Sequence, residues 1–236
     1  MTRSYISSVR YKAVALLLFF LSVAFAGPLP TACANEEAWQ HIGDYEGVAL
    51  YRSVYETEGV LPFKAVAVLD IPFDKIVMAL VDAERKADWA PKLKATAIHT
   101  RISPNRFEYS EYYQTPWPFK DREFLLAGTV EYRQDRIVFA AENSTNGALA
   151  RKDHLRANIQ TLTFDVVPIS AGRTEVAFTF SGDLGGWIPA FVKTIIQKKW
   201  PVRFIQSMKQ YIASNDSLET ERYRSLEKTT VVFQQP

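Results

Sequence analysis

The stretch that most constrains this fold is the last long segment that can form a helix, residues 185–213. Its first half carries apolar side chains at helical spacing, centred on Val192 and Ile196. Apolar positions continue after Pro201, but at about 100° per residue their centre lies roughly opposite the first stripe. The sequence therefore predicts either a helix kinked at Pro201 or a helix buried on more than one side. In both cases the helix needs a large apolar partner.

The partner predicted for this helix is an antiparallel sheet. Consecutive strand patterns separated by short turns fill most of the preceding chain, and such an order is typical of antiparallel pairing. A helix is expected from Phe73, after Pro72, and residues 39–42 are interpreted as a short helix. The predicted strands are residues 48–55, 63–69, 95–102, 106–114, 122–133, 136–142, 154–167 and 174–183. The predicted fold class is α+β, a curved sheet closed by the terminal helix.

The N-terminus has the composition of a secretory signal peptide. Three basic residues precede an apolar run at positions 13–26, and small residues follow up to Ala34. This run of 14 residues is shorter than the ~20 that a membrane-spanning helix needs. We therefore expect residues 1–34 to be removed, with cleavage after Ala34 or, alternatively, after Ala26. The mature protein would be secreted, with a bacterial periplasm as the expected compartment.

The single cysteine, Cys33, lies inside this predicted signal peptide. Removing residues 1–34 would take away three basic and no acidic residues and lower the formal charge from +2 to −1. An exported chain without cysteine has no disulfides, so disulfide-stapled scaffolds and thiol-dependent enzymes are excluded. The alternative is that Cys33 becomes a lipidated N-terminus, which Pro30 disfavours.

The rest of the chain has the composition of one globular domain. Of 236 residues, 47% are hydrophobic and 23% are charged, which is enough for a sizeable core. The predicted domain covers residues 35–213 and is followed by a mostly polar tail at 214–236. Its basic residues are scattered, so we expect no nucleic-acid partner, and we expect a monomer.

One strand face that is expected to point inward carries a carboxylate. In the strand 106–114, alternation places on the same face Phe107, Tyr109, Glu111 and Tyr113. A buried carboxylate must be paired, hydrogen-bonded or protonated, since leaving it unsatisfied costs several kcal/mol. Two interpretations of Glu111 remain open. It forms a structural pair with Arg122, Arg156 or a tyrosine hydroxyl, or it is a polar anchor in an apolar ligand pocket.

The loop before the strand that begins at Arg122 is too long for a tight hairpin. Residues 115–121, TPWPFKD, place two prolines around Trp117, which stiffens the backbone. Such a compact aromatic loop either plugs an edge of the sheet or forms a movable lid over a pocket. On the strand that follows, Phe124 and Leu126 are expected to face inward together with Arg122.

Motifs of the common catalytic and metal sites are absent from the sequence. It has no glycine-rich phosphate loop, no nucleophile-elbow serine, no paired-histidine zinc motif and no calcium loop. The three histidines are far apart and show no metal-ligand spacing. We therefore predict no catalytic residue, no metal and no cofactor.

Several segments are distinctive in their order along the chain. They are FKAVAVLDIPFDKIVMALVD followed by ERKADWAPKL, then PFKDREFLL, LRA at 155–157, and GGWIPAFV. Each motif is weak when taken singly, but their order and spacing are specific together. Together they resemble the START family, the lipid-transfer domains related to the steroidogenic acute regulatory protein, and the likeness covers roughly residues 39–212.

The resemblance implies a helix-grip fold, in which an antiparallel sheet wraps a long C-terminal helix and leaves an internal hydrophobic tunnel for one lipid. It also implies a lid made by residues 115–121 and the helix, with Trp117, Trp187 and Phe191 as gate candidates. In cholesterol-binding relatives, the basic partner of a carboxylate matching Glu111 aligns with Gly128, so cholesterol specificity is not implied. The expected ligand-binding residues are Phe107, Tyr109, Glu111, Tyr113, Trp117, Arg122, Phe124, Leu126, Arg156, Trp187, Phe191 and Ile195.

The function expected from this resemblance is binding or transfer of one lipid, such as a phospholipid or a sterol, by an exported protein that transiently touches a membrane surface. An alternative is a helix-grip enzyme of the polyketide cyclase or aromatase type. Its acid and base candidates would be Tyr109, Glu111, Tyr113 and Arg122. A third possibility is a lipid sensor that does not transfer its ligand.

Overall fold

The computed structural model describes residues 39–55, 59–133 and 135–215. The predicted signal peptide, residues 1–34, lies outside the described residues, as does the predicted tail from residue 216 onward. The strands are β1 (Trp39–Tyr45), β2 (Val48–Ser53), β3 (Phe63–Leu69), β4 (Leu93–Ser103), β5 (Arg106–Tyr113), β6 (Arg122–Arg133), β7 (Arg136–Asn143), β8 (Leu155–Arg156), β9 (Asn158–Ser170) and β10 (Arg173–Asp183). The helices are α2 (Phe73–Val81), α3 (Ala190–Thr194) and α4 (Trp200–Ser214).

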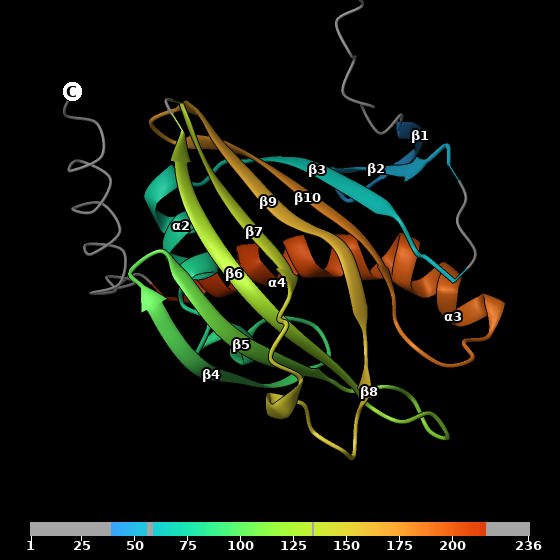
Figure 1. Ribbon diagram of the computed structural model, residues 1–236. Coiled ribbons are helices and arrows are strands. Elements are labelled where there is room, and N and C mark those ends of the chain that lie inside the picture. The colour runs from blue at the N-terminus through green and yellow to red at the C-terminus, as the bar shows by residue number, and fades with distance from the viewer. Residues whose placement is uncertain (1–38, 56–58, 134, 216–236) are drawn as a thin grey trace, which may run out of the picture. The chain divides into compact units, whose positions relative to one another are not determined.

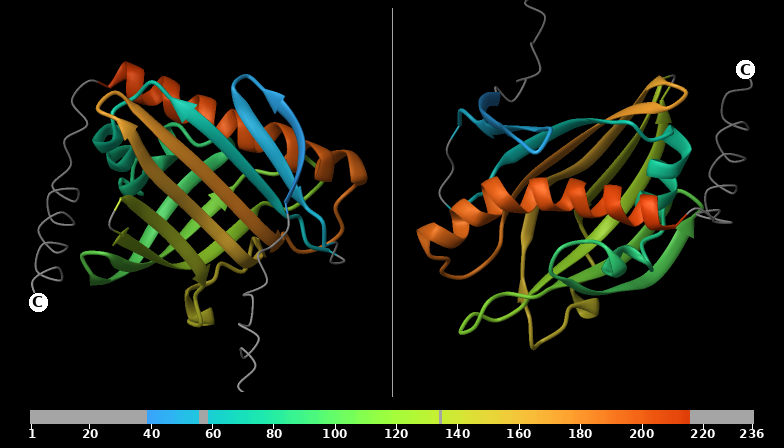
Figure 2. Two further views of the ribbon diagram at one scale, coloured as in Figure 1. Left: turned by 90° about the horizontal axis from the view of Figure 1, so that it is seen from above. Right: turned by 180° about the vertical axis from the view of Figure 1, so that it is seen from behind.

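The strands form a single curved sheet around the C-terminal helix. Their order is β1-β2-β3-β10-β9-β7-β6-β5-β4, and all of these pairs are antiparallel, while β8 pairs in parallel with β6. Figure 1 and the reverse view in Figure 2 show the sheet wrapping the helical segment α3–α4, with α2 at one end of the concave face. The predicted α+β helix-grip architecture, a curved antiparallel sheet around a long C-terminal helix, is confirmed.

The predicted strands are confirmed with small shifts at their ends, but the short helix predicted at residues 39–42 is wrong. These residues belong to β1, which pairs with β2 and has a bulge between His41 and Gly43. Four residues cannot repay the cost of nucleating a helix, whereas pairing with β2 gives the backbone its hydrogen bonds at once.

The strand predicted at 154–167 is divided into β8 and β9. Leu155 and Arg156 pair with Arg122 and Glu123 of β6, and β9 then pairs with β10 and β7. A single strand cannot pair in both places, so the chain changes neighbours at Ala157.

The terminal helix begins later than predicted and is not a plain α-helix. Residues 185–189 form a turn in which Gly185 and Gly186 have positive φ angles of 75° and 67°. A Cβ atom at Gly185 would lie 2.9 Å from the carbonyl oxygen of Arg156, so the turn requires glycine there. Helix α3 is followed by a π-helical turn, Ile195–Lys199, and then by α4.

The π turn explains why the two halves of this helix carry their apolar stripes on different sides. Such a turn takes one extra residue, so the side chains after it are rotated by about 100° relative to an uninterrupted α-helix. Pro201 lies in the first turn of α4, where its missing N–H costs little. The helix therefore changes its facing direction through the π turn, which neither a simple kink nor burial on several sides would provide.

The core fills the middle of the concave face with aromatic side chains. The ring of Phe164 stacks on that of Phe178 at 4.4 Å, and Phe204 of α4 lies 5.0 Å from Phe178. Within the described residues, no helix has the length and apolar content needed to cross a membrane. Two cavities lie on either side of this aromatic core.

Candidate functional site

The main cavity opens between the 115–121 loop and the first half of the terminal helix. It has a volume of about 490 Å³, which lies in the usual range for small-molecule sites. Most of its lining is apolar, with a few polar groups near the mouth. The lining residues are Pro91, Lys92, Tyr113, Gln114, Thr115, Pro116, Phe119, Arg122, Phe124, Phe180, Leu184, Ile188, Pro189, Phe191, Val192, Ile195, Ile196, Trp200 and Arg203.

The loop that forms one side of the mouth is fastened at both ends. The N–H of Thr115 donates to Asp121 Oδ1 over 2.9 Å, and Lys94 Nζ donates to Asp121 Oδ2 over 2.8 Å. The hydrogen bond from Lys94 holds the pKa of the Asp121 carboxyl below its usual value. Between these ends the Trp117–Pro118 peptide bond is cis. The hydrogen bonds to Asp121 therefore fix the base of the loop.

The buried side chain of Arg122 connects the two sides of the mouth. Its guanidinium donates to the carbonyl oxygens of Lys120 (2.6 Å), Leu184 (3.3 Å) and Gly185 (3.2 Å). Charged donors make stronger hydrogen bonds than neutral ones. Arg122 therefore ties the end of the loop to the turn that leads into α3.

The inner end of the main cavity is closed by the aromatic core. The partly buried indole of Trp200 lines the cavity and lies 5.6 Å from the ring of Phe178 and 5.7 Å from that of Phe204. Its Nε1 donates to the carbonyl oxygen of Pro91 over 3.3 Å. This hydrogen bond and the ring contacts fix the indole across the concave face.

A second, much smaller cavity lies beyond this aromatic core. It measures about 40 Å³, about enough for a single water molecule. Its lining residues are Leu80, Ala83, Lys86, Phe107, Tyr109, Glu111, Gly128, Thr129, Val130, Phe139, Ala140, Ala141, Leu162 and Phe164. We refer to it as the minor cavity.

The carboxylate of Glu111 at the minor cavity is fully paired. Lys86 Nζ lies 2.6 Å from Glu111 Oε1, and the hydroxyl of Tyr113 donates to Glu111 Oε2 over 2.9 Å. The ammonium group also lies 5.8 Å and 5.7 Å from the ring centroids of Phe164 and Phe204. Burial and the Glu111 carboxylate raise the pKa of the Tyr113 hydroxyl well above its ordinary value.

The partners of Glu111 match one of the predicted alternatives and add a residue that was not predicted. A tyrosine hydroxyl does bind it, but Arg122 and Arg156 do not, and Lys86 supplies the positive charge. A basic side chain at position 128 could not supply this positive charge without rearrangement of its neighbours, because a Cβ atom at Gly128 would lie 2.9 Å from Tyr109 Cε1.

The twelve residues expected to bind ligand fall into three groups. Five line the main cavity: Tyr113, Arg122, Phe124, Phe191 and Ile195. Three line the minor cavity: Phe107, Tyr109 and Glu111. The other four line neither cavity: Leu126 is buried in the core, Arg156 donates to the carbonyl oxygen of Ser144, and Trp117 and Trp187 are 92% and 76% exposed.

Two residues that sequence reasoning missed hold key positions. Trp200 follows Val192 and Ile196 at intervals of four residues, which is a helical spacing that could have included it. Lys86 lies in a 3₁₀ turn between α2 and β4. No local signal distinguishes it from neighbouring basic residues, because its role depends on β5 passing beside that turn.

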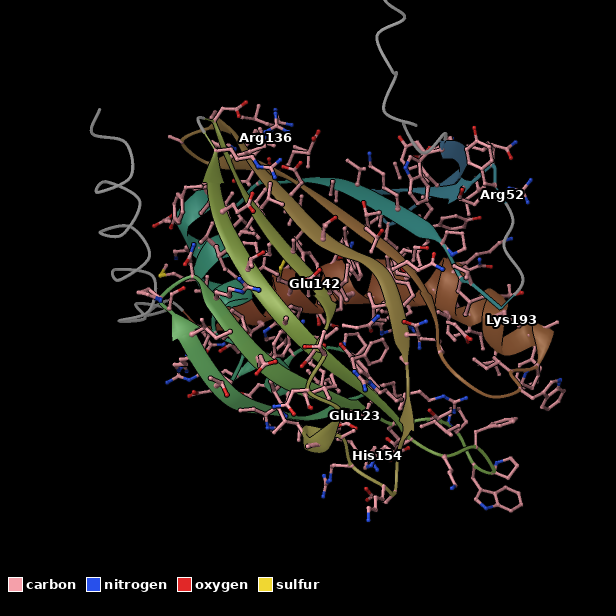
Figure 3. The ribbon with its side chains drawn as sticks, viewed as in Figure 1. Arg52, Glu123, Arg136, Glu142, His154 and Lys193 are labelled. Atoms are coloured by element: carbon pink, nitrogen blue, oxygen red, sulfur yellow. The ribbon has the colours of Figure 1, made fainter. Side chains whose placement is uncertain are left out.

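The opposite face of the sheet carries a separate buried network. Glu123 lies on the face of β6 opposite to Phe124, where the structure buries it completely. Ser110 Oγ donates to Glu123 Oε1 over 3.0 Å, and the N–H of Arg151 donates to Oε2 over 2.8 Å. Figure 3 labels Glu123 on this face. Here the carboxylate fastens the Arg151 segment to the sheet.

No metal site is found in the part of the chain that the structure describes. Among those residues, His, Cys, Asp and Glu side chains nowhere form a group of three or more that could hold a metal ion. The lining of the main cavity offers apolar contact, with hydrogen-bonding groups at Tyr113 and Arg122.

Comparison with known proteins gives one family match and several similar folds. A family model described as the START domain matches residues 29–212. The mitochondrial steroidogenic acute regulatory protein of Gallus gallus is 26% identical over 158 residues, covering 64% of this chain and 56% of that protein.

Two solved structures illustrate the shared fold. Human StAR-related lipid transfer protein 5 has a TM-score of 0.69 at 14% identity, covering 89% of this chain and 97% of that one. A STAR-related lipid transfer protein fragment from Xanthomonas axonopodis has a TM-score of 0.64 at 21% identity, covering 74% and 98%. At these identities the likeness shows the fold.

Proposed function

Because the chain belongs to the START domain family, which binds lipids and transfers them, we propose that this protein encloses one lipid in its main cavity and carries it between membranes. The observation that supports the proposal most directly is the cavity itself, about 490 Å³ of mainly apolar space beneath a loop and a helix. An apolar ligand gains about 25 cal/mol for each Å² that the cavity removes from water. No covalent step is needed.

The polar groups of the cavity lie where they can orient a ligand. Tyr113 and Arg122 line the main cavity together with Gln114 and Thr115 near the mouth, while the helix side contributes Val192 and other aliphatic residues. A site of this kind uses apolar walls for affinity and a few polar groups for orientation. We propose that the lipid places its polar end toward Arg122 and its apolar part toward α3 and Trp200.

The mouth also has the features of a membrane-contact surface. Trp117 is 92% exposed, Trp187 is 76% exposed and Phe191 is 66% exposed, and the ring of Phe119 lies 6.0 Å from that of Trp187. Figure 3 shows Lys193 on α3, the helix that also carries Phe191. Indole rings favour the membrane interface and lysines favour anionic headgroups. We propose that this surface touches the membrane while the 115–121 loop moves aside to exchange lipid.

The experiment that tests the proposal is native mass spectrometry of the purified protein, followed by extraction and identification of whatever is bound. We expect one unmodified lipid per protein chain, and transfer of that lipid between vesicles. A protein that binds no lipid and converts a polyketide would contradict the proposal and favour the cyclase alternative. A protein that binds a lipid but moves none between vesicles would favour a sensor.

We further propose that the protein acts as a monomer outside the cytoplasm. The proposal of export depends on the signal-peptide pattern of residues 1–34, which lie outside the described residues. N-terminal sequencing of the protein from its native host should find residue 35 or residue 27 first. A lipid-modified Cys33 would instead indicate an anchored form, and a retained Met1 would contradict export. Light scattering would test the monomeric state.

A further inference from the structure

Trp200 occupies the boundary between the main cavity and the aromatic core. It lines the cavity on one side, and on the other it contacts Phe178 and Phe204. The ring of Phe164, which lines the minor cavity, lies 4.4 Å from Phe178 and 5.4 Å from Phe204. The rings between the two cavities therefore follow one another as Trp200, then Phe178 with Phe204, then Phe164, and Trp200 is the ring that faces the main cavity.

Local structure holds the indole in this position. Trp200 comes directly after the π turn Ile195–Lys199, and without that turn its side chain would point in a direction rotated by about 100°. Its Nε1 donates to the carbonyl oxygen of Pro91, so the partly buried N–H is satisfied without a ligand. The rings of Phe63 and Tyr113 lie 5.8 Å and 5.9 Å away on its flanks.

We propose that Trp200 is the specificity-determining residue that sets the depth of the main cavity and so the length of the apolar ligand that fits. The inference depends on the proposed lipid-binding function and adds to it a maximum length for the bound apolar chain. A ligand enters from the mouth, extends along Val192 and Ile196, and stops at the indole. Replacing the indole with a small side chain deepens the cavity toward Phe204, so that longer chains fit.

The test compares wild-type protein with Trp200→Ala and Trp200→Phe, using saturated fatty acids from octanoate to stearate as probes in calorimetric titrations. Tyr55→Ala is the matched control, because it removes an exposed aromatic ring that lines neither cavity. Each additional methylene that becomes buried should raise affinity about fourfold. We expect the gain to stop at a shorter chain in wild type and Tyr55→Ala than in Trp200→Ala.

A uniform loss of affinity in Trp200→Ala, with the same optimal chain length, would overturn the inference. Trp200→Phe should give a smaller shift in the same direction, and it keeps the test available if Trp200→Ala does not fold. A crystal structure of the folded variant gives a readout that needs no ligand, because the cavity should extend toward Phe204. If no fatty acid binds any of these proteins, the proposed function loses support. The inference about Trp200 is still tested in that case, because the main cavity in the crystal structure of the variant either extends toward Phe204 or does not.

Discussion

At the scale of the residue, Glu111 and Lys86 form an ion pair that is buried inside the sheet, 2.6 Å apart. Breaking a buried pair on one side leaves the other charge without a partner, which is costly. We expect Glu111→Gln to lower the free energy of unfolding of the ligand-free protein by about 3 kcal/mol, as measured by urea denaturation.

Two comparisons show whether this loss comes from the unpaired lysine. Replacing both partners, in Lys86→Met with Glu111→Leu, should restore much of the stability, because no charge is then left buried. Glu84→Gln, which breaks an exposed pair with Arg101, should change stability little. If Glu111→Gln keeps wild-type stability and loses affinity for lipid, Glu111 is a ligand anchor instead.

Tyr113 gives a pH dependence whose sign follows from its raised pKa. The ordinary pKa of a tyrosine hydroxyl is about 10, and the folded protein holds the pKa of Tyr113 well above that value, since burial and Glu111 favour the neutral form. The folded state therefore retains a proton that the unfolded state loses. The stability that Tyr113 contributes is fully present below about pH 10 and is lost as the pH rises further, toward the folded pKa.

Tyr113→Phe should reveal this contribution. The variant loses the hydrogen bond to Glu111, so it should be less stable than wild type by about 1 kcal/mol near neutral pH. The difference in stability between wild type and variant should narrow as the pH rises above about 10. Only the wild type has the hydroxyl, whose proton the unfolded chain releases in this range. Urea midpoints of both proteins, measured across this range, check the prediction. A gap that widens with pH would contradict it.

At the scale of the element, Arg122 connects the 115–121 loop to the turn before α3. Arg122→Ala removes three hydrogen bonds to the carbonyl oxygens of Lys120, Leu184 and Gly185. We expect faster amide hydrogen exchange in residues 115–121 and 184–189, with the sheet still protected, because these bonds fasten only the mouth.

The control for Arg122→Ala is Arg133→Ala, at the other end of the same strand. Arg133 is exposed and pairs with Glu131, so its loss should leave exchange at the mouth unchanged. Uniformly faster exchange across β6 and its neighbours in Arg122→Ala would mean that the arginine supports the whole sheet. Both variants can be followed by mass spectrometry of peptides from the mouth.

Most elements could be predicted because their patterns are local. Residues 63–69 alternate and form β3 with the predicted bounds, and α2 begins at Phe73 as predicted. The exceptions have non-local causes. Strand β1 forms because β2 provides a free edge for it to pair with, and β8 is separate from β9 because it pairs with β6. The π turn allows both apolar stripes of the terminal helix to pack against the same sheet.

At the scale of the whole molecule, three exposed aromatic side chains lie at the mouth of the main cavity, namely Trp117, Trp187 and Phe191. Trp117→Ala should slow the transfer of a fluorescent lipid between vesicles severalfold, because the indole would anchor the protein in the interface. Its affinity for that lipid in solution should change little, since Trp117 does not line the cavity. A stopped-flow assay with anionic vesicles measures the rate.

A matched control for Trp117→Ala is Ile169→Ala. Ile169 is also an exposed apolar residue, but it lies near the turn between β9 and β10, at the end of those strands away from the mouth. Its replacement should leave the transfer rate unchanged. Equal rates for wild type and Trp117→Ala would contradict the proposed role of the mouth in membrane contact.

The sequence by itself determined the succession of strands, the terminal helix and the family motifs, because periodicity and turn chemistry are properties of neighbouring residues. It also placed a carboxylate on the concave face, and the need of that group for a partner followed from burial alone. The spacing of four residues between Val192, Ile196 and Trp200 is a local pattern as well. It could have placed Trp200 on the cavity-lining side of the helix, although the sequence-based prediction did not include this residue.

Only the tertiary structure decided which groups meet. Lys86 reaches Glu111 because the 3₁₀ turn after α2 lies beside β5, and Arg122 finds its carbonyl acceptors where β10 ends. Trp200 closes the main cavity because the π turn directs it across the sheet. These contacts join residues far apart in the chain, and their geometry exists only once the sheet has curved around the helix.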